Sequence, residues 1–575
     1  MNGYSHNPIS SLRQIVSGFK ALKNFHLSDL RKVFSLMGKN EKIALLALTL
    51  AALISLLVSE KNFYISNTKI VPAFGGQLTE GLLGQPQYIN PLLAISDTDQ
   101  SLTRLIFSGL YKYGPNGELI PDLAENLPEI SDDQKNYIIT LKKNAVWHNN
   151  TPVTVEDIIF TVETLKNPEF KSPLRGFWLN TRVEKISDNQ IKFINKDISG
   201  PFIFNLTLPI LPKNIWQKVD ASGFLLNKTN LEAVGSGPYA ISQIKKLPNG
   251  KIESITLKSF NDFYKSRPNI ETFNIKFYDS AEDIINGLRG KEIDLAGSLP
   301  AAGEDLSDIS SNYKLIKLPL PQYQTAFFNL NEGLTSQEFI RKSLNLATNK
   351  QAIIDEVYLS ERQLPLDPLT KQVISDTANM PEAAKILDQA GWTLGQENIR
   401  QKKDQKLGLT ITASDSVSAK ETAQNLKSQW EKLGLEINVD IKPSKQLMDE
   451  TLRPRKFQVL IYSQKFGADP DPFFFWHSSQ SKDPGLNLTG LSDGNLDKLL
   501  TDARNTTNQE ARLAKYSELG KVISGKYAVI LLNQNQYFYF INSKVQNINL
   551  TSLNDTSSRF YDLPNWYINT KRVWK

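Results

Sequence analysis

The stretch F-G-A-D-P-D-P-F-F-F-W-H-S-S-Q, residues 466–480, places two acids and two prolines next to three phenylalanines and a tryptophan. A residue before proline is kept out of the α region, so we expect Asp469 and Asp471 on stiff, extended backbone. The apolar run 457–462 is predicted to be the strand that leads into this loop. Such a loop can hold a carboxylate beside an apolar wall, which suits a small ligand with one cationic end. The competing interpretation is a surface turn followed by aromatic residues that pack in the core.

Composition narrows the class of protein. A chain of 575 residues with 40% hydrophobic residues predicts two to four domains with sizeable cores. The absence of cysteine excludes disulfides, thiolate zinc sites and a cysteine nucleophile, and four histidines leave little for a metal cluster. We therefore expect no metal and no cofactor. Of the net charge of +6, residues 1–42 carry +5, which argues against a nucleic-acid interface in the folded part.

An apolar segment near the start predicts a membrane anchor. Residues 43–58 carry no charge, and with Ser59 they give a predicted transmembrane signal anchor at 43–59, close to the ~17–25 residues of a span. The basic tail, residues 1–42, is then expected in the cytoplasm, with a linker at 60–71 and everything after it outside. The alternative is a cleaved signal peptide, but L-V-S-E-K lacks a small-residue cleavage site. Apolar residues at helical spacing in 12–22 predict either an amphipathic helix on the inner leaflet or a short helix without a role.

The rest of the chain alternates strands and helices. Strand–helix–strand patterns at 273–295 and at 409–441 predict a sheet covered by helices. Capping boxes are predicted at Thr154 with Asp157 and at Thr335 with Glu338, and a strand is predicted at 202–208. Residues 235–240, G-S-G-P-Y-A, loosely match a dinucleotide fingerprint, but Pro238 interrupts it and a strand pattern follows, so a turn into a strand is the better interpretation.

Several motifs occur in one order along residues 72–545 and carry a family resemblance. They are G-G-Q-L-T-E-G (75–81), L-I-F-S-G-L-Y (105–111), T-P-V-T-V-E-D-I-I-F (151–160), G-S-G-P-Y (235–239), P-E-A-A-K-I-L-D-Q-A-G-W (381–392) and the D-P-D-P loop. With these motifs the chain resembles the extracellular solute-binding protein family 5, the oligopeptide- and dipeptide-binding proteins of ABC importers.

The resemblance implies an α/β fold of the periplasmic-binding-protein type (class II), with two lobes that close by a hinge and an extra inserted subdomain. Placed on this chain, lobe I comprises 72–112, 232–324 and 535–575, the inserted subdomain 113–231, and lobe II 325–534, with hinge crossings near 324 and 535. In peptide-binding members an aspartate of this loop accepts the peptide's ammonium group, and main-chain groups pair with the peptide backbone. Asp469 is the first candidate for that acid and Asp471 the second. Other candidate ligand-binding residues are Phe466, Gly467, Ala468, Trp476, Glu80, Gly81, Tyr239 and Asn487.

The function implied is a membrane-anchored extracytoplasmic protein that captures peptides and delivers them to the permease subunits of an ABC importer. The alternatives are the same fold with a non-peptide solute, and a ligand sensor or envelope scaffold without transport. An enzyme is disfavoured because the chain contains no P-loop and no H-E-x-x-H motif. His148 and His477 are the only histidines beyond the basic tail.

Overall fold

The computed structural model describes residues 34–575, except for 115–116, 298, 300–308, 310, 360 and 377. It divides into two compact units, which are described separately. The first contains the residues up to 72 together with 570–575, and the second contains residues 73–569. The helix predicted within 12–22 lies outside the described residues.

The first unit is built on one long apolar helix. Helix α3 (Lys39–Asn67) has 29 residues, which gives a length of about 44 Å at 1.5 Å per residue. It is long and apolar enough to cross a membrane by length and composition. The predicted linker at 60–71 is wrong, because α3 runs to Asn67 and strand β1 (Thr68–Ala73) follows directly. No glycine or proline occurs between 60 and 71, so nothing in the sequence stops the helix earlier.

The end of the chain belongs to this first unit. Strand β22 (Asn569–Trp574) pairs with β1 in a two-stranded sheet. The assignment of 570–575 to lobe I is therefore corrected: these residues group with the helix.

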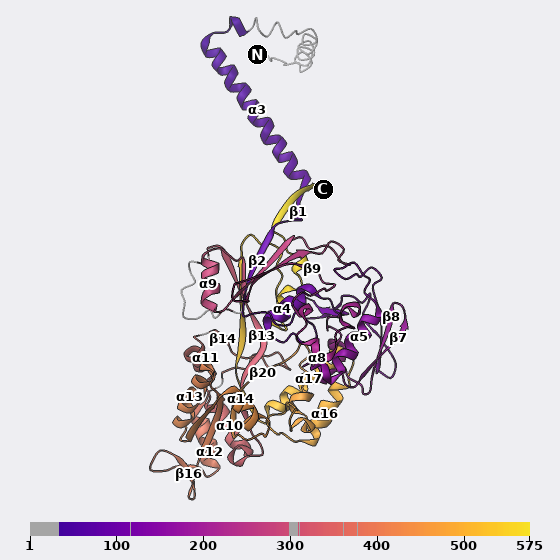
Figure 1. The fold of residues 1–575 in the computed structure, drawn as a ribbon. Coiled ribbons are helices and arrows are strands. Elements are labelled where there is room, and N and C mark those ends of the chain that lie inside the picture. Colours follow the sequence, from indigo (N-terminus) through magenta and orange to yellow (C-terminus); the bar gives the residue numbers. More distant parts are fainter. Residues whose placement is uncertain are drawn as a thin grey trace, which may run out of the picture. The chain divides into compact units, whose positions relative to one another are not determined.

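The second unit contains one large sheet. Its strand order is β19-β18-β20-β13-β21-β12-β2-β11-β10-β9, with β14 also on β21. Figure 1 shows how β13 leads from one half of the unit to the other. The strands are β2 (Gln77–Leu83), β9 (Tyr239–Lys246), β10 (Ile252–Ser259), β11 (Thr272–Tyr278), β12 (Leu295–Gly297), β13 (Tyr313–Phe328), β14 (Arg362–Gln363), β18 (Gly408–Ser414), β19 (Glu436–Lys442), β20 (Val459–Lys465) and β21 (Val529–Asn542).

Two long strands join the halves of this sheet. β13 and β21 pair antiparallel from Tyr313↔Asn542 to Phe327↔Val529, and their register is irregular between Pro319 and Thr325. We call the half on β12-β2-β11-β10-β9 lobe I and the half on β20-β18-β19 lobe II. The irregular pairing therefore lies where the chain passes from one lobe to the other, and the predicted hinge positions 324 and 535 fall within or next to it.

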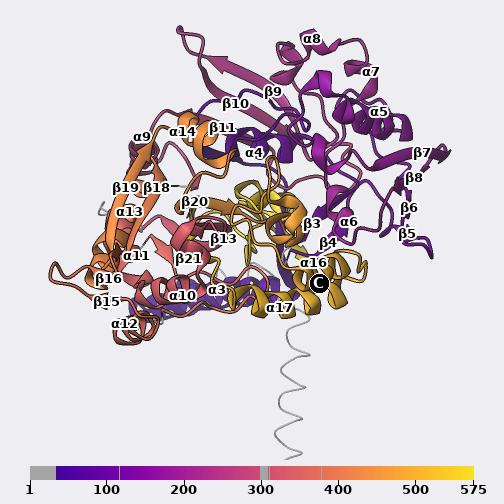
Figure 2. The ribbon, with the colours of Figure 1, turned by 90° about the horizontal axis from the view of Figure 1, so that it is seen from below.

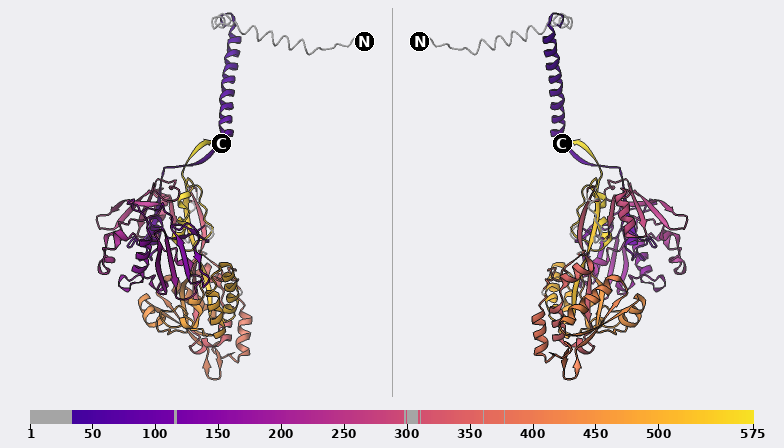
Figure 3. Two further views of the ribbon diagram at one scale, coloured as in Figure 1. Left: turned by 90° about the vertical axis from the view of Figure 1, so that its right-hand side faces the viewer. Right: turned by 90° about the vertical axis from the view of Figure 1, so that its left-hand side faces the viewer.

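Helices cover each half. The predicted strand–helix–strand units are confirmed: α9 (Ala281–Arg289) connects β11 to β12, and α13 (Val417–Lys432) connects β18 to β19. Lobe I also holds α4 (Asp97–Ile106). Lobe II holds α10 (Glu338–Ala347), α11 (Lys350–Tyr358), α12 (Met380–Gln389), α16 (Gly494–Arg504) and α17 (Gln509–Ser524). In Figure 3 the orange elements of lobe II lie on one side of the second unit and the purple elements of lobe I on the other.

The predicted inserted subdomain, residues 113–231, contains a separate sheet in the order β5-β6-β8-β7. Its strands are β5 (Glu129–Ile130), β6 (Asn136–Thr140), β7 (Thr181–Ser187) and β8 (Gln190–Asn195), and its main helix is α5 (Val155–Lys166). The predicted strand at 202–208 is wrong. Helix α6 (Phe202–Asn205) begins there after Pro201, and the Phe202 ring packs 5.0 Å from the Tyr137 ring.

The local sequence signals gave mixed results. The first capping box is confirmed, because the Thr154 amide donates to Asp157 Oδ2 at 2.8 Å. The second is wrong, because the Thr335 hydroxyl instead bonds the carbonyl of Asn329 at 2.6 Å, and α10 begins after Gln337. The G-S-G-P-Y-A stretch leads into β9, as predicted.

Candidate functional site

The acidic loop begins at the end of β20, beside the passage between the lobes. β20 pairs with β13 from Phe328↔Val459 to Gln322↔Lys465, so its last residue lies next to the irregular part of β13. The Phe466 amide donates to the Pro321 carbonyl at 2.9 Å, and the buried Phe466 ring lies 4.7 Å from the Phe475 ring. Gly467 is exposed and Ala468 half-buried. The loop thus rests on an aromatic base that fixes it to the interlobe strands.

Asp469 is fully engaged within lobe II. Its Oδ2 accepts from Arg512 Nε at 2.8 Å and lies 2.8 Å from Arg512 Nη2, and its Oδ1 accepts from the Tyr516 hydroxyl at 2.8 Å. Arg512 and Tyr516 stand one turn apart on α17, so one helix face provides both partners. The carboxylate of Asp469 therefore already has a buried counter-charge from its own lobe.

Asp471 has spare bonding capacity. Its Oδ2 lies 3.5 Å from Arg504 Nε, while its buried Oδ1 has no hydrogen-bond partner among the described residues. Burial, and to a lesser extent the neighbouring Asp469 charge, raises the pKa of Asp471 to about 6, while the Arg504 guanidinium and the Phe473 amide oppose this rise. Of the two acids in the loop, Asp471 is therefore the one that lacks a saturated partner set.

The backbone of Asp471 corrects the expectation of extended chain. Its φ is +25°, in the left-handed range, rather than extended. The Asp469 carboxylate accepts the Asp471 amide at 3.0 Å, and this local turn overrides the preference imposed by the following proline.

The loop and α16 meet the inserted subdomain in what we call the interlobe contact. The Phe474 ring lies edge-on to Phe177, with centroids 6.1 Å apart, and the Gly200 amide donates to the Arg504 carbonyl at 2.8 Å. The Thr507 hydroxyl donates to Gln134 Oε1 at 2.6 Å. Figures 1 and 2 both show α16 and α17 next to the inserted subdomain.

Gly200 is required by this contact. A Cβ at this position would lie 2.1 Å from the Thr506 carbonyl oxygen and 2.7 Å from Arg512 Nη1. Arg512 Nη1 also donates to the Thr506 carbonyl at 2.9 Å. The arginine that pairs with Asp469 therefore also holds the backbone against which the inserted subdomain rests.

Charged groups of lobe I face the loop from the other side. Arg104 of α4 and Asp555 form a partly exposed ion pair at 3.9 Å, with 20% and 22% of the side chains exposed. Burial acts to raise the pKa of Asp555, but Arg104 and, across the lobes, Lys465 bring it below its usual value. Burial raises the pKa of Tyr113 to about 12, and Asp469 is among the charges that act on this hydroxyl. Charges of both signs from both lobes therefore converge at the loop.

The structure places Glu80 and Gly81 inside lobe I rather than on a wall facing the loop. Glu80 is completely buried, with its Oε1 2.8 Å from Arg559 Nε and its Oε2 3.2 Å from the Tyr539 hydroxyl. Burial raises the pKa of Glu80, and Arg559 opposes the rise. A Cβ on Gly81 would lie 2.7 Å from Ile293 Cδ1. Both residues therefore lie in the core of the sheet, which corrects the expectation that they contact a ligand.

Three further candidates also lie in cores. The buried Tyr239 hydroxyl donates to the Ile270 carbonyl at 3.0 Å, and Asn487 Nδ2 donates to the Leu491 carbonyl at 2.9 Å. Trp476 packs in a cluster with Leu496 and other apolar residues of α16 and α17. Their aromatic and amide groups are used within the fold, which corrects the expectation that they face a ligand.

Sequence reasoning missed a network of amides where the lobes join. Asn533 Nδ2 donates to Gln324 Oε1 at 2.9 Å, and Gln534 Nε2 donates to the Leu320 carbonyl at 2.9 Å. Gln536 Nε2 bonds Gln363 Oε1 of β14 at 2.8 Å. The signal in the sequence was N-Q-N-Q at 533–536 within an otherwise apolar strand, opposite P-Q-Y-Q at 321–324.

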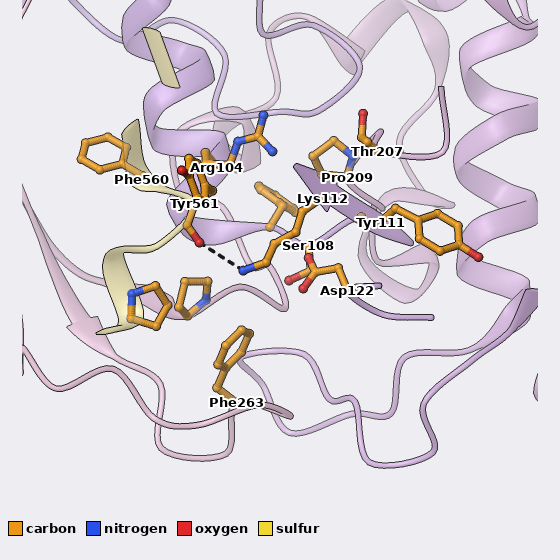
Figure 4. Close-up of a pocket in the computed structure, with 14 residues that line it drawn as sticks. Arg104, Ser108, Tyr111, Lys112, Asp122, Thr207, Pro209, Phe263, Phe560 and Tyr561 are labelled. Carbon is orange, nitrogen blue, oxygen red and sulfur yellow. Dashed lines mark hydrogen bonds between the residues drawn. The ribbon is translucent and has the colours of Figure 1, made fainter. Parts of the chain in front are cut away.

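A small pocket lies in lobe I, and charged side chains of its lining are already paired within the protein. Its lining includes Arg104, Lys112, Asp122, Phe263 and Tyr561 (Figure 4). Lys112 Nζ donates to the Tyr561 carbonyl at 3.1 Å, and Asp122 forms an ion pair with Lys265 at 2.8 Å. Burial lowers the pKa of Lys112, and Asp122 opposes this. Among the described residues, no group of three acidic or histidine side chains could hold a metal ion.

Two α/β lobes joined by a shared pair of long strands, with a charged loop where they meet, define a two-lobed solute-binding protein. The model of the bacterial extracellular solute-binding proteins, family 5 Middle, matches residues 118–485, and the chain belongs to this family. It is a family of solute-binding transport proteins rather than of enzymes.

Curated relatives and solved structures agree with this membership. The oligopeptide-binding protein AppA of Bacillus subtilis (strain 168) is 24% identical over 509 residues, which cover 84% of this chain and 92% of that protein. The structure of AppA from Bacillus subtilis in complex with a nonapeptide matches with a TM-score of 0.66 and 21% identity, covering 87% of this chain and 100% of that one. NikZ from Campylobacter jejuni in complex with Ni(L-His) matches with a TM-score of 0.67 and 23% identity, covering 85% and 99%.

Proposed function

We propose that this protein captures peptides between its two lobes by hinge closure and delivers them to the permease of an ABC importer. The observation that carries the proposal is the unsaturated, buried carboxylate of Asp471 at the interlobe contact. An ammonium group leaving water needs a counter-charge and hydrogen-bond acceptors, and Asp471 Oδ1 offers both.

In this proposal Asp471 takes the cationic end of the ligand in place of Asp469. Arg512 and Tyr516 bind the Asp469 carboxylate, so Asp469 acts on the ligand only indirectly. It does so by fixing the turn that positions Asp471. Gly467 and Ala468 leave room for the backbone of a ligand beside the loop. Arg104 and Lys465 supply positive charge for a ligand's carboxylate.

The family also supports a second ligand class. NikZ from Campylobacter jejuni was solved in complex with Ni(L-His), a small solute rather than a peptide chain. In the same proposal Asp471 would take the ammonium group of a free amino acid and Arg104 its carboxylate, so small non-peptide solutes form the second candidate.

Helix α3 supplies the attachment to the membrane in this proposal. Residues 43–59 cross the bilayer as an uncleaved anchor, and the +5 charge of residues 1–42 keeps that end in the cytoplasm. The two lobes then lie outside the cytoplasmic membrane, where they can bind a solute before its import.

The test is thermal unfolding of the purified full-length protein in detergent with defined peptide pools. A cognate peptide at a hundredfold excess over its Kd stabilises the folded state by ~2.7 kcal/mol, which raises the melting temperature. N-acetylated versions of the same peptides are the matched control and should shift it less. No shift with any free peptide pool, together with a shift by free amino acids or their metal complexes, would favour the second ligand class.

A further inference from the structure

The junction between α3 and β1 is tied together by the last residues of the chain. The Lys575 amide donates to the Asn67 carbonyl at 2.9 Å, and Lys575 Nζ donates to the Ser66 carbonyl at 2.6 Å. Arg572 Nη1 donates to Thr68 Oγ1 at 2.9 Å. The end of α3 therefore has carbonyls satisfied by Lys575, the cationic residue that follows β22, an arrangement that also suits the helix dipole.

An exposed aromatic group stands at this junction. The Trp574 ring lies 6.4 Å from Phe63 and 5.8 Å from Tyr64, and the exposed fractions are 63%, 64% and 44%. Phe63 and Tyr64 follow the proposed span, residues 43–59, by four and five residues, a rise of about 6 to 8 Å. The aromatic group therefore lies in the interfacial layer next to the hydrocarbon core, where tryptophan and tyrosine are enriched in membrane proteins.

The charge around the junction is predominantly positive. Residues 60–79 and 563–575 contain five basic residues (Lys61, Lys69, Lys571, Arg572 and Lys575) and one acidic residue, Glu60. The rest of the chain beyond residue 42 carries a net charge of about −3, so the positive charge is local to this region. An anionic surface would attract the junction and repel the remainder of the outer part.

The strands β1 and β22 form a sheet of only two strands. A two-stranded ribbon is marginally stable in water by itself. Its exposed Ile70 and Trp574 are apolar, so contact with an apolar–anionic interface would supply the missing burial.

We propose that the β1–β22 ribbon and the last turn of α3 form a collar that lies in the headgroup layer of an anionic phospholipid bilayer. The collar rests on the proposed membrane anchor and adds a second, surface attachment through the end of the chain. The outer part is thus attached at both its entry and its exit, by residues far apart in the sequence.

The experiment uses the full-length chain reconstituted into vesicles of phosphatidylcholine with or without phosphatidylglycerol. Because the chain contains no cysteine, Ile70→Cys carries a single environment-sensitive fluorophore, and Lys403→Cys, on an exposed turn of lobe II, is the matched control. Lipids with a quencher near the headgroup report contact. Extraction of the same vesicles at alkaline pH reports anchoring independently.

Quenching at residue 70 but not at 403, stronger with phosphatidylglycerol, is the expected result. Each basic residue near an anionic surface increases membrane binding roughly fivefold. The double variant Lys69→Gln with Lys571→Gln should therefore lower the ratio of membrane-bound to unbound collar on the order of 25-fold. Lys403→Gln with Lys445→Gln, both exposed, is the charge-matched control and should leave it unchanged. Equal quenching at 70 and 403 in a chain that resists extraction would overturn the collar and leave the anchor intact. Release of the chain by extraction would overturn the anchor, and the collar with it.

Discussion

The interlobe contact predicts a specific effect of replacing Gly200 with alanine. The new Cβ would lie 2.1 Å from the Thr506 carbonyl oxygen and 2.9 Å from its carbon, and both are backbone atoms that cannot rotate away. The inserted subdomain must then move off α16 and α17, which breaks the 2.8 Å bond from Gly200 to the Arg504 carbonyl.

The cost can be worked out from these contacts. Overpacking a fitted contact costs ~1–3 kcal/mol, and loss of one hydrogen bond costs about 1 kcal/mol. The closed arrangement should therefore lose about 2–4 kcal/mol relative to an open one, in which Gly200 and Thr506 separate. If ligand binds only the closed form, the Kd rises by roughly 30-fold to 1,000-fold, because each 1.4 kcal/mol is tenfold.

The assay is calorimetric titration with a peptide identified by the thermal screen. Gly176→Ala is the matched control, because a Cβ at that glycine of the same subdomain meets no atom within 4 Å. Thermal unfolding without ligand should be nearly the same for both variants, since the open form relieves the clash. An unchanged Kd for Gly200→Ala, or an equal loss of stability without ligand, would refute the reasoning that this contact belongs to closure.

Three further predictions concern buried charges. Burial raises the pKa of Asp471 to about 6 from ~3.9 in the unfolded chain, so the folded state holds this proton more tightly. The free energy of unfolding should therefore fall as pH rises from about 4 to 6, by at most roughly 3 kcal/mol. Urea unfolding of Asp471→Asn should lack this fall. Arg559→Met leaves the buried Glu80 without its partner and should cost ~3–5 kcal/mol in the same assay, whereas adding Glu80→Gln should restore part of it. Asp469→Asn leaves Arg512 buried without its carboxylate and should lower the melting temperature more than it alters the preference for free over acetylated peptides; the opposite order would return Asp469 to the role of ligand acid.

The sequence was sufficient for the order of elements, because that order depends on local periodicity and on motifs. The strand–helix–strand units and the capping box at Thr154 involve neighbours in the chain, and they are confirmed. The strand predicted at 202–208 was wrong, because alternating apolar residues cannot distinguish a strand from a short buried helix after proline.

The candidate site was harder to predict because burial is decided by distant partners. Glu80 reads as a polar residue at a strand's glycine-flanked end, yet Arg559, 479 positions away, makes it a core residue. The same holds for Asp469, whose partner Arg512 lies 43 positions further along the chain. No local pattern near these acids predicts that either arginine will pair with them. The sequence therefore could not distinguish an acid that binds a ligand from one that stabilises the fold.

The central claim is that Asp471 holds the cationic end of a peptide enclosed between the lobes. Its most direct test is calorimetric titration of one peptide, free and N-acetylated, into the native protein and into Asp471→Asn. We predict that the native protein prefers the free peptide by at least tenfold at pH 7 and that Asp471→Asn abolishes this preference. An Asp471→Asn variant that retains the full preference would contradict the account.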